Sequence, residues 1–423
     1  MMWCLLCLSL MVAATTAKKL NVYRKPEDRS PTFIIRDMMK IESDAIAQKR
    51  DESTPIKITL QNNQDAAYTG KLSLGGNKEE HTFFFDTGSP WLWVALDDCT
   101  SCNWPGVNPY TPDSGTNKPS SKIGNATYVD GQFATGNIAT DEVRITADSE
   151  PITMNIIGVS EAHDIGNIPA DGILGLAPSP AKNTDLFVTQ LHKQGLIPDD
   201  MFGLEIKPNG QDSFITLGGY DTERVPDPKE IKWINLYNKD SWWTEFRHVY
   251  YGDTILSSKG GLVVFDSGTS ITTMSENILY AIINGFYTKT EGQSCTIKQF
   301  QGLDLWHCPC IGNFDDIGIS MNGYMAFLNS DLIIKDAGQG ECAIEILPAK
   351  FEGDNDIILL GDNFFFDYYV VHDINGGKIY DEDSDTGMRI GLVGNIVEND
   401  DGAFGSVISS ALAMLVMATL FLN

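Results

Sequence analysis

Short runs of β-branched and aromatic residues, separated by Gly, Asn, Asp and Pro, recur along most of the chain. Runs of this length between turn residues are typical of β-strands. Long stretches with helical periodicity are missing, and we expect only short helices, at residues 184–194 and 276–287. The pattern therefore predicts a mostly β protein, with strands that include residues 81–85, 128–133, 213–217, 262–265 and 324–328.

An apolar strand that ends in Asp-(Thr/Ser)-Gly occurs twice. Residues 83–89 read Phe-Phe-Phe-Asp-Thr-Gly-Ser, and residues 263–269 read Val-Val-Phe-Asp-Ser-Gly-Thr. Each is followed, further along the chain, by two apolar residues and a glycine, at residues 173–175 and 359–361. A single Asp-Ser-Gly is a common turn. Two such motifs in register, each followed later in the chain by two apolar residues and a glycine, imply a duplicated lobe.

The repeat places Asp86 and Asp266 where acid–base chemistry is expected. An apolar strand delivers each carboxylate to a dry site, and the small residue and glycine that follow permit a tight turn with N–H groups facing the carboxylate. If the lobes face each other, the two carboxylates share one proton and can activate a water without a metal or a covalent nucleophile. The alternative is that both are turn aspartates that cap loops.

These motifs resemble those of the pepsin family (A1-type aspartic proteases). Residues 85–89 with 92–94 are similar to the first aspartate motif, and residues 264–270 to the second. Residues 171–176 and 358–362 are similar to the strands that cross under each aspartate. The similarity covers about residues 55–396. It implies an all-β, bilobal acid protease fold: two pseudo-symmetric β-barrel-like lobes, a central cleft and few short helices.

The resemblance also implies roles for the neighbours of the two aspartates. Ser89 and Thr269 would hydrogen-bond the outer carboxylate oxygens. Thr87 and Ser267 would tie the two loops together, within turns that Gly88 and Gly268 complete.

A second resemblance concerns a hairpin over the cleft. Tyr128 is similar to the family's flap tyrosine, with Asp130 and Gly131 beside it for substrate binding. Trp93 is similar to the tryptophan behind that tyrosine, although core packing explains it equally well. Without the resemblance, Tyr128 is an ordinary strand aromatic. A sequon, Asn125-Ala126-Thr127, lies beside this segment and is a candidate for glycosylation.

The 423 residues are more than one core usually holds, which also favours two lobes. The net charge of −27 argues against nucleic-acid binding, because such a field repels phosphates, and it suits work at acidic pH. Residues 18–50 nevertheless carry a net charge of +4. They form either a solvated basic tail or a segment that lies on the acidic body. The family resemblance favours the second reading, a prosegment at residues 18–53 that inhibits the enzyme until acid releases it.

Both ends of the chain resemble targeting signals. Residues 1–17 are apolar and close on small residues, as in a secretory signal peptide, although a membrane anchor is the alternative. Small residues, a short spacer and the apolar run at residues 407–422 fit a GPI-attachment signal, with a tail helix as the alternative. We expect the secretory pathway, ending outside the cell, in an acidic lysosome- or vacuole-like compartment, or at the cell surface.

Six cysteines lie outside the signal-like segment, and an even number in an oxidising compartment suggests three disulfides. Cys99-x-x-Cys102 also fits half a zinc site or a redox pair. The family resemblance implies the pairs Cys99–Cys102 and Cys310–Cys342, which leaves Cys295–Cys308, although Cys308 and Cys310 can exchange partners.

The expected organisation has five parts, with a linker near residues 221–230: a signal peptide at 1–17, a prosegment at 18–53, an N-terminal lobe at 54–228, a C-terminal lobe at 229–397, and a linker with a hydrophobic segment at 398–423. The expected activity is hydrolysis of extended peptides by a monomer, with no metal and no cofactor.

Asp381, Asp383 and Asp385 have the spacing of a calcium loop, but lack its central glycine and final glutamate, so a solvated loop is the other reading. A non-catalytic binding protein on the same scaffold and a cell-surface structural protein are the other hypotheses.

Overall fold

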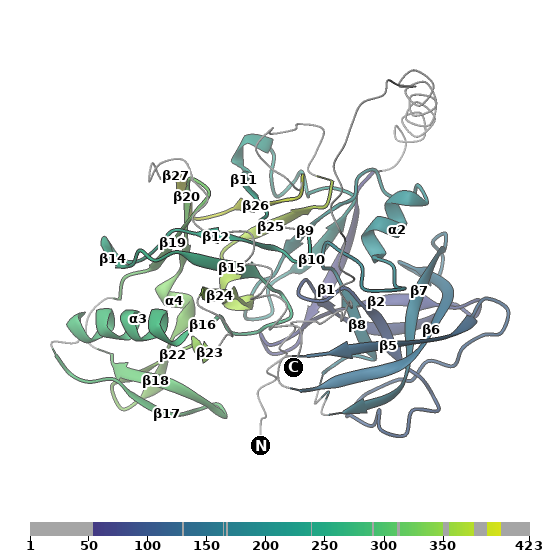
Figure 1. Cartoon of the computed structure of the whole chain (residues 1–423), viewed down its shortest axis with the longest axis horizontal. Coiled ribbons are helices and arrows are strands. Elements are labelled where there is room, and N and C mark those ends of the chain that lie inside the picture. Colours follow the sequence, from purple (N-terminus) through teal and green to yellow (C-terminus); the bar gives the residue numbers. More distant parts are fainter. Residues whose placement is uncertain are drawn as a thin grey trace, which may run out of the picture.

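The computed structural model describes residues 54–128, 131–163, 165, 168–237, 239–289, 292–310, 314–349, 355–375 and 387–398. Within these residues the chain forms strands and four short helices: α2 (Phe187–Lys193), α3 (Glu276–Lys289), α4 (Ser330–Ile333) and α5 (Asp362–Phe365). Figure 1 shows the earlier strands (purple and blue) on one side and the later ones (green) on the other. The predicted all-β, bilobal fold is confirmed.

The N-terminal lobe is one strongly curved sheet. Its strands run in the order β1-β2-β3-β8-β4-β7-β6-β5, and an extra pairing of β2 with β6 closes it on itself. The lobe is therefore barrel-like, and β5 is left at the end of the sheet. The strands are β1 (Ile56–Asn62), β2 (Tyr68–Leu74), β3 (Glu79–Asp86), β4 (Leu92–Ala95), β5 (Lys118–Thr127), β6 (Phe133–Arg144), β7 (Ile152–His163) and β8 (Gly172–Gly175).

The sheet continues from β1 into strands that join the lobes. The order β1-β10-β9-β25-β26-β11 places the first described strand beside strands from the middle and the end of the chain. All of these pairings are antiparallel. The added strands are β9 (Met201–Glu205), β10 (Ser213–Leu217), β11 (Lys232–Asn235), β25 (Tyr369–Asp373) and β26 (Arg389–Val393).

The C-terminal lobe contains three smaller sheets. One holds β12 (Trp243–Phe246), β15 (Gly261–Phe265), β16 (Thr273–Ser275), β23 (Leu347–Ala349) and β24 (Asp356–Leu360). The second holds β13 (His248–Tyr251), β14 (Thr254–Ser257), β19 (Ile317–Met321), β20 (Tyr324–Leu328) and β27 (Ile396–Glu398). The third holds β17 (Thr296–Phe300), β18 (Leu303–Pro309), β21 (Ile334–Gly338) and β22 (Glu341–Ile344).

The sequence repeat corresponds to a repeat in the strand pairing. β3 lies parallel to β8 and β15 lies parallel to β24, and in each lobe a further strand, β4 or β16, pairs antiparallel with the second of these. A β-carbon added at Gly175 would lie 2.4 Å from the Ser89 carbonyl oxygen, and one at Gly361 would lie 2.5 Å from that of Thr269. Only glycine allows this approach, which explains why both downstream apolar pairs are followed by Gly.

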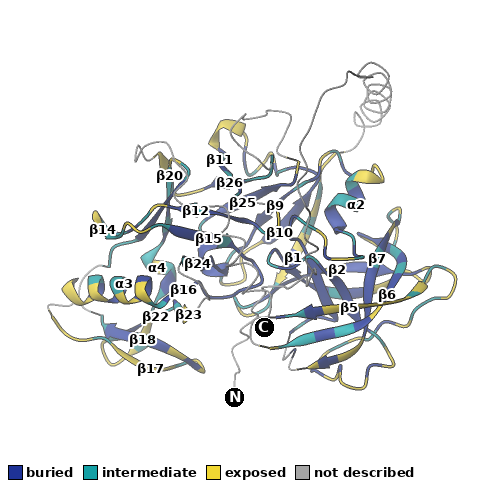
Figure 2. Cartoon of the chain, in the orientation of Figure 1, coloured by how far each residue is buried: buried dark blue, intermediate teal, exposed yellow. Residues whose placement is uncertain are grey.

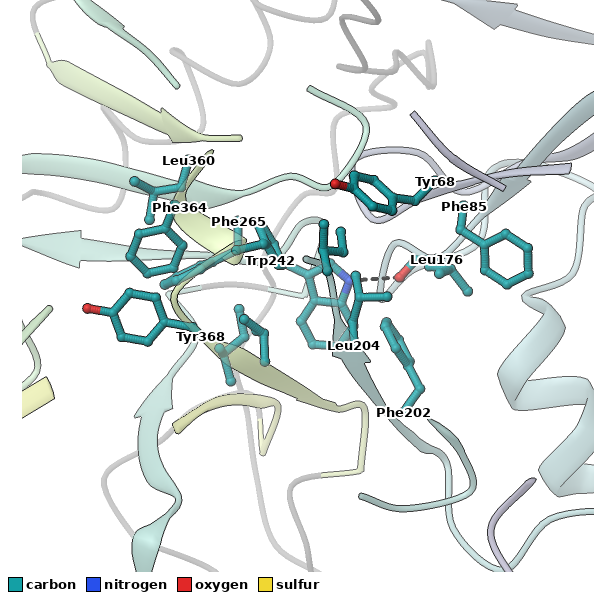
Figure 3. Packing of buried hydrophobic residues seen from close by; sticks show 14 of the residues in the cluster. Tyr68, Phe85, Leu176, Phe202, Leu204, Trp242, Phe265, Leu360, Phe364 and Tyr368 are labelled. Atoms are coloured by element: carbon teal, nitrogen blue, oxygen red, sulfur yellow. Dashed lines mark hydrogen bonds between the residues drawn. The ribbon is translucent and has the colours of Figure 1, made fainter. Parts of the chain in front are cut away.

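The hydrophobic core is continuous between the lobes. Phe85 and Leu176 from the N-terminal lobe belong to the same buried cluster as Trp242 and Phe265 from the C-terminal lobe (Figure 3). The Trp242 indole N–H donates to the Leu176 carbonyl oxygen at 2.7 Å. Figure 2 shows these central strands as buried, whereas α3 exposes one side and most of β17 is exposed. The shared core and this bond couple the positions of the two lobes.

Three disulfides occur among the described residues: Cys99–Cys102, Cys295–Cys308 and Cys310–Cys342. The last two fasten β17, β18 and β22 at the outer end of the C-terminal lobe. Cys308 and Cys342 are register partners on neighbouring strands, yet each bonds a cysteine outside that pair. The structure therefore has the expected pairs, and Cys308 and Cys310 have not exchanged partners.

Most expected elements are present, but one predicted strand is wrong. Residues 81–85 and 262–265 lie in β3 and β15, residues 213–217 and 324–328 are β10 and β20, and the two helices are α2 and α3. Of residues 128–133, Phe133 begins β6, and the other described ones, Tyr128, Gly131 and Gln132, lie between β5 and β6. Tyr128 N–H donates to the Gln132 carbonyl oxygen at 2.8 Å, and Gly131 has a φ of 84°, a conformation that glycine adopts without strain.

Several predictions concern residues outside those that the structure describes: the signal peptide, the prosegment, residues 399–423, Asp130, and the acidic loop with Asp381, Asp383 and Asp385. In the described part of the chain, no helix combines the length and the apolar character needed to cross a membrane.

Candidate active site

Asp86 and Asp266 occupy equivalent turns. Asp86 ends β3 and Asp266 directly follows β15, and neither side chain is exposed to solvent. In each turn the N–H group two residues on donates to the carboxylate: Gly88 to Asp86 Oδ1 at 2.8 Å and Gly268 to Asp266 Oδ1 at 2.9 Å. The apolar strands therefore hold both carboxylates in a dry environment, with a backbone donor that stabilises the charged form.

The residues after the two aspartates bind each other across the lobes. Thr87 Oγ1 donates to the Phe265 carbonyl oxygen and Ser267 Oγ to the Phe85 carbonyl oxygen, both at 3.1 Å. Ser267 N–H donates to Thr87 Oγ1 at 2.8 Å, and Thr87 N–H to Ser267 Oγ at 3.2 Å. These four bonds, which we call the cross-lobe clasp, hold the two aspartate turns against each other in a nearly two-fold arrangement.

Ser89 and Thr269 differ, although equivalent roles were expected. Thr269 Oγ1 donates to Asp266 Oδ2 at 3.0 Å. The Ser89 hydroxyl is buried and has no hydrogen-bond partner among the described residues. The expected bond is thus present in the C-terminal lobe and missing in the N-terminal one. Threonine is restricted at χ1 by its branched β-carbon, whereas serine can turn its hydroxyl away.

A third carboxyl group lies close to the pair. Asp362 begins α5, directly after Gly361, and its N–H donates to the Thr269 carbonyl oxygen at 2.8 Å. Its side chain is fully buried, and neither oxygen has a hydrogen-bond partner in the described part of the chain. The pKa of Asp362 is raised well above its usual range, mostly by burial and then by the negative charge of Asp266.

Asp65 and Asp86 raise the pKa of Asp362 further, so this group lies within electrostatic reach of both candidate aspartates. In the sequence, Asp362 is the last residue of the motif at residues 358–362, and the motif predicted no role for its side chain. A signal was present: the position after the downstream glycine is Leu176 in the N-terminal lobe, and a carboxyl replaces that apolar residue in the C-terminal lobe.

Tyr128 lies directly after β5, and a hydrogen bond from Trp93 holds its side chain. The Trp93 indole N–H donates to the Tyr128 hydroxyl oxygen at 2.8 Å, and both rings are buried. Trp104 contacts Trp93 edge-on, with ring centroids 6.3 Å apart. The structure therefore joins Tyr128 and Trp93, as the family resemblance implied. Among the described residues, no three His, Cys, Asp or Glu side chains gather in a way that could hold a metal ion.

Comparison with known proteins decides the family. The profile of the eukaryotic aspartyl protease family matches residues 67–380, which include both aspartate turns and the hairpin. The chain belongs to this family. As a pepsin-like aspartic protease it is an endopeptidase, and its substrates are peptides.

Individual relatives agree with this assignment over most of the chain. The aspartic protease is 28% identical to pepsin A of Sus scrofa over 394 residues, which cover 90% of this chain and 98% of that pepsin. It is 25% identical to rhizopuspepsin of Rhizopus chinensis, over 73% of this chain and 76% of that protein. It is 27% identical to cathepsin E of Aquarana catesbeiana, over 80% and 83% of the two chains.

Proposed function

We propose that Asp86 and Asp266 are the catalytic pair of this aspartic endopeptidase. The cross-lobe clasp is the observation that carries the proposal, because it sets the two buried aspartate turns face to face. Two carboxylates in such a site cannot both ionise cheaply, so the pair shares one proton; pepsin is the reference case for this effect.

The shared proton gives each step of hydrolysis a donor and an acceptor. One carboxylate takes a proton from a water held between the pair, and the water oxygen attacks the carbonyl carbon of the peptide bond. The other carboxyl donates its proton to the carbonyl oxygen. The tetrahedral intermediate then breaks its C–N bond. One carboxyl donates its proton to the departing amine, and the other carboxylate takes a proton from a hydroxyl of the intermediate, so the pair again holds one proton.

The neighbouring residues support this pair. Thr269 holds the outer oxygen of Asp266, and Gly88 and Gly268 fix both turns through their N–H groups. Tyr128 and Gly131, with Asp130, form the flap that closes over an extended peptide and excludes water from the reacting bond.

The proposal extends to the parts that flank the two lobes. Residues 1–17 direct the protein to the secretory pathway, and residues 18–53 form a basic prosegment that covers the acidic cleft. The prosegment leaves at low pH because protonation of carboxylates weakens its electrostatic attachment. The mature monomer consists of residues 54–228 and 229–397, and residues 398–423 attach it to a membrane by a GPI-type signal. The three disulfides support an oxidising compartment.

Substitution of each aspartate by asparagine tests the catalytic assignment. Asp86→Asn and Asp266→Asn preserve shape but remove the shared proton, so we expect kcat to fall by on the order of 10^3-fold or more. Cleavage of a protein substrate at pH 3–5, sensitive to pepstatin, is the assay. Asp200→Asn is the matched control, because Asp200 is also buried and hydrogen-bonded, to Thr189, but lies outside the aspartate turns. Full activity in either active-site variant would refute the assignment.

Mass spectrometry during acid incubation tests the proposed processing. We expect loss of a fragment that ends near residue 53, and intact mass shows whether the C-terminal segment is replaced by a lipid. An Asp86→Asn sample separates self-cleavage from cleavage by another protease. A full-length chain that is active without any processing would contradict the prosegment.

A further inference from the structure

Strand β5 is an exposed edge. Among the described strands it pairs with β6 alone, and it ends the strand order of the large sheet. An edge strand presents unpaired N–H and C=O groups that can add to a strand of another molecule, and proteins usually protect such edges. Any device that protects β5 should lie on its solvent face.

The solvent face of β5 carries an apolar residue. Ile123 is 58% exposed, the largest value among the exposed large hydrophobic residues of the described chain. Residues of the other parity point inward: a β-carbon at Gly124 would lie 2.7 Å from the Ile157 side chain, and Ala126 is fully buried. Asn125 is exposed and follows Ile123 on the same face, about 7 Å along the strand.

Asn125 begins the sequon Asn125-Ala126-Thr127, and the sequence contains no second Asn-x-Ser/Thr. Its side-chain oxygen accepts a hydrogen bond from Thr135 Oγ1 on β6. Glycosylation uses the other atom of the amide, Nδ2. The fold therefore presents the sequon on an exposed face and holds the amide through the oxygen that the reaction leaves untouched.

We propose that Asn125 carries an N-linked glycan, and that this glycan shields the β5 edge and Ile123 from pairing with other chains. In the transfer, Nδ2 forms a bond to the anomeric carbon of a lipid-diphosphate-linked oligosaccharide and loses one proton. The bond from that carbon to the diphosphate oxygen breaks, and the lipid diphosphate leaves with the electron pair. Because Asn125 lies two residues from Ile123 on the same face of β5, a bulky polar glycan on Asn125 covers the Ile123 side chain. It also obstructs the approach of another chain along the β5 edge.

This inference rests on the proposed entry into the secretory pathway. The full chain is produced in a secreting eukaryotic cell as wild type and as Thr127→Ala, Thr127→Ser and Asn125→Gln. We expect peptide-N-glycosidase F to lower the mass of the wild type and of Thr127→Ser, which keeps the sequon, and to leave the other two unchanged. A secreted wild type without a glycan would overturn the inference. Protease activity in the same samples tests the proposed function separately, because glycan attachment does not require activity.

Light scattering over a range of protein concentrations tests the shielding. We expect Thr127→Ala to self-associate at concentrations where Thr127→Ser remains monomeric. Adding Ile123→Thr to Thr127→Ala should weaken this association, because the uncovered edge then lacks its exposed apolar side chain. Equal association of Thr127→Ala and Thr127→Ser would show that the glycan does not shield the edge.

Discussion

The two lobes hold Asp86 and Asp266 on matching backbone but surround them with different side chains. Strand pairing, turn hydrogen bonds and the close approach of Gly175 and Gly361 are the same on both sides. Two differences between the lobes change the chemistry around the aspartates: Ser89 against Thr269, and Leu176 against Asp362. The backbone thus gives two aspartates similar positions, while the side chains give them unequal surroundings.

Unequal surroundings have a chemical use, because a pair that shares one proton needs a preferred location for it. Thr269 donates to Asp266, which favours the charged form of that carboxyl. Asp362 is a third acidic group, close to both Asp86 and Asp266, and a negative charge on Asp362 would oppose ionisation of these two aspartates. The comparison therefore predicts that substitutions in the clasp affect both lobes, and that substitutions at the unequal positions act mainly on the C-terminal side.

Breaking the clasp should have the largest effect. Thr87→Val keeps the shape of Thr87 but removes its hydroxyl, which leaves Ser267 N–H without its acceptor in the buried interface. We expect the buried Ser267 N–H, now without a hydrogen-bond acceptor, to lower the unfolding free energy by about 1–3 kcal/mol. We also expect kcat to fall, because the two aspartate turns separate. Urea unfolding and peptide hydrolysis measure the two effects. Ser267→Ala should behave alike, and a difference in stability loss greater than twofold between them would contradict a symmetric clasp.

Removing the titratable group at position 362 should change how stability depends on pH. Because the pKa of Asp362 is raised in the folded state, its contribution is favourable below the unfolded pKa near 4 and is lost as pH rises toward the folded value. Asp362→Asn should therefore flatten the loss of stability above about pH 4 and leave stability at pH 3 nearly unchanged. Denaturant midpoints from pH 3 to 7 measure this.

Asp362→Leu sharpens the same test, because it gives the C-terminal lobe the residue that the N-terminal lobe has at Leu176. If Asp362 is the pH-sensitive group, both variants flatten the curve. An unchanged pH dependence in Asp362→Asn would place that sensitivity elsewhere.

The smallest expected effect concerns Ser89 and Thr269. Thr269→Val removes the donor to Asp266 without changing the shape, so we expect a loss of kcat corresponding to about 1–2 kcal/mol. Ser89→Ala should cost less, since its hydroxyl makes no hydrogen bond to the described residues. Steady-state kinetics with one short peptide compares the two. Equal losses in the two variants would mean that the lobes are equivalent during catalysis, and a larger loss for Ser89→Ala would contradict the prediction.

Much of this arrangement was predictable from the repeat alone. The two Asp-(Thr/Ser)-Gly motifs and their downstream glycines indicated duplicated lobes. That the hydroxyls of Thr87 and Ser267 join the lobes was implied only by the family resemblance. The strand predicted at residues 128–133 was wrong, because aromatic and β-branched residues around Tyr128 outweighed the turn signal of Asp130-Gly131 in the pattern. The environment of Asp362 depends on charges from Asp65, Asp86 and Asp266, which are distant in sequence and meet only in the fold.

The sheet that joins the lobes has a consequence for biosynthesis. β9 pairs with β10 on one side and with β25 on the other, so a strand from the middle of the chain awaits a partner that leaves the ribosome near the end of synthesis. A nascent chain that stops before β25 leaves the β9 edge uncovered, and contacts so distant in sequence form slowly. The lobes are therefore poor candidates for separate expression, and premature termination should yield an aggregating product rather than a half-enzyme.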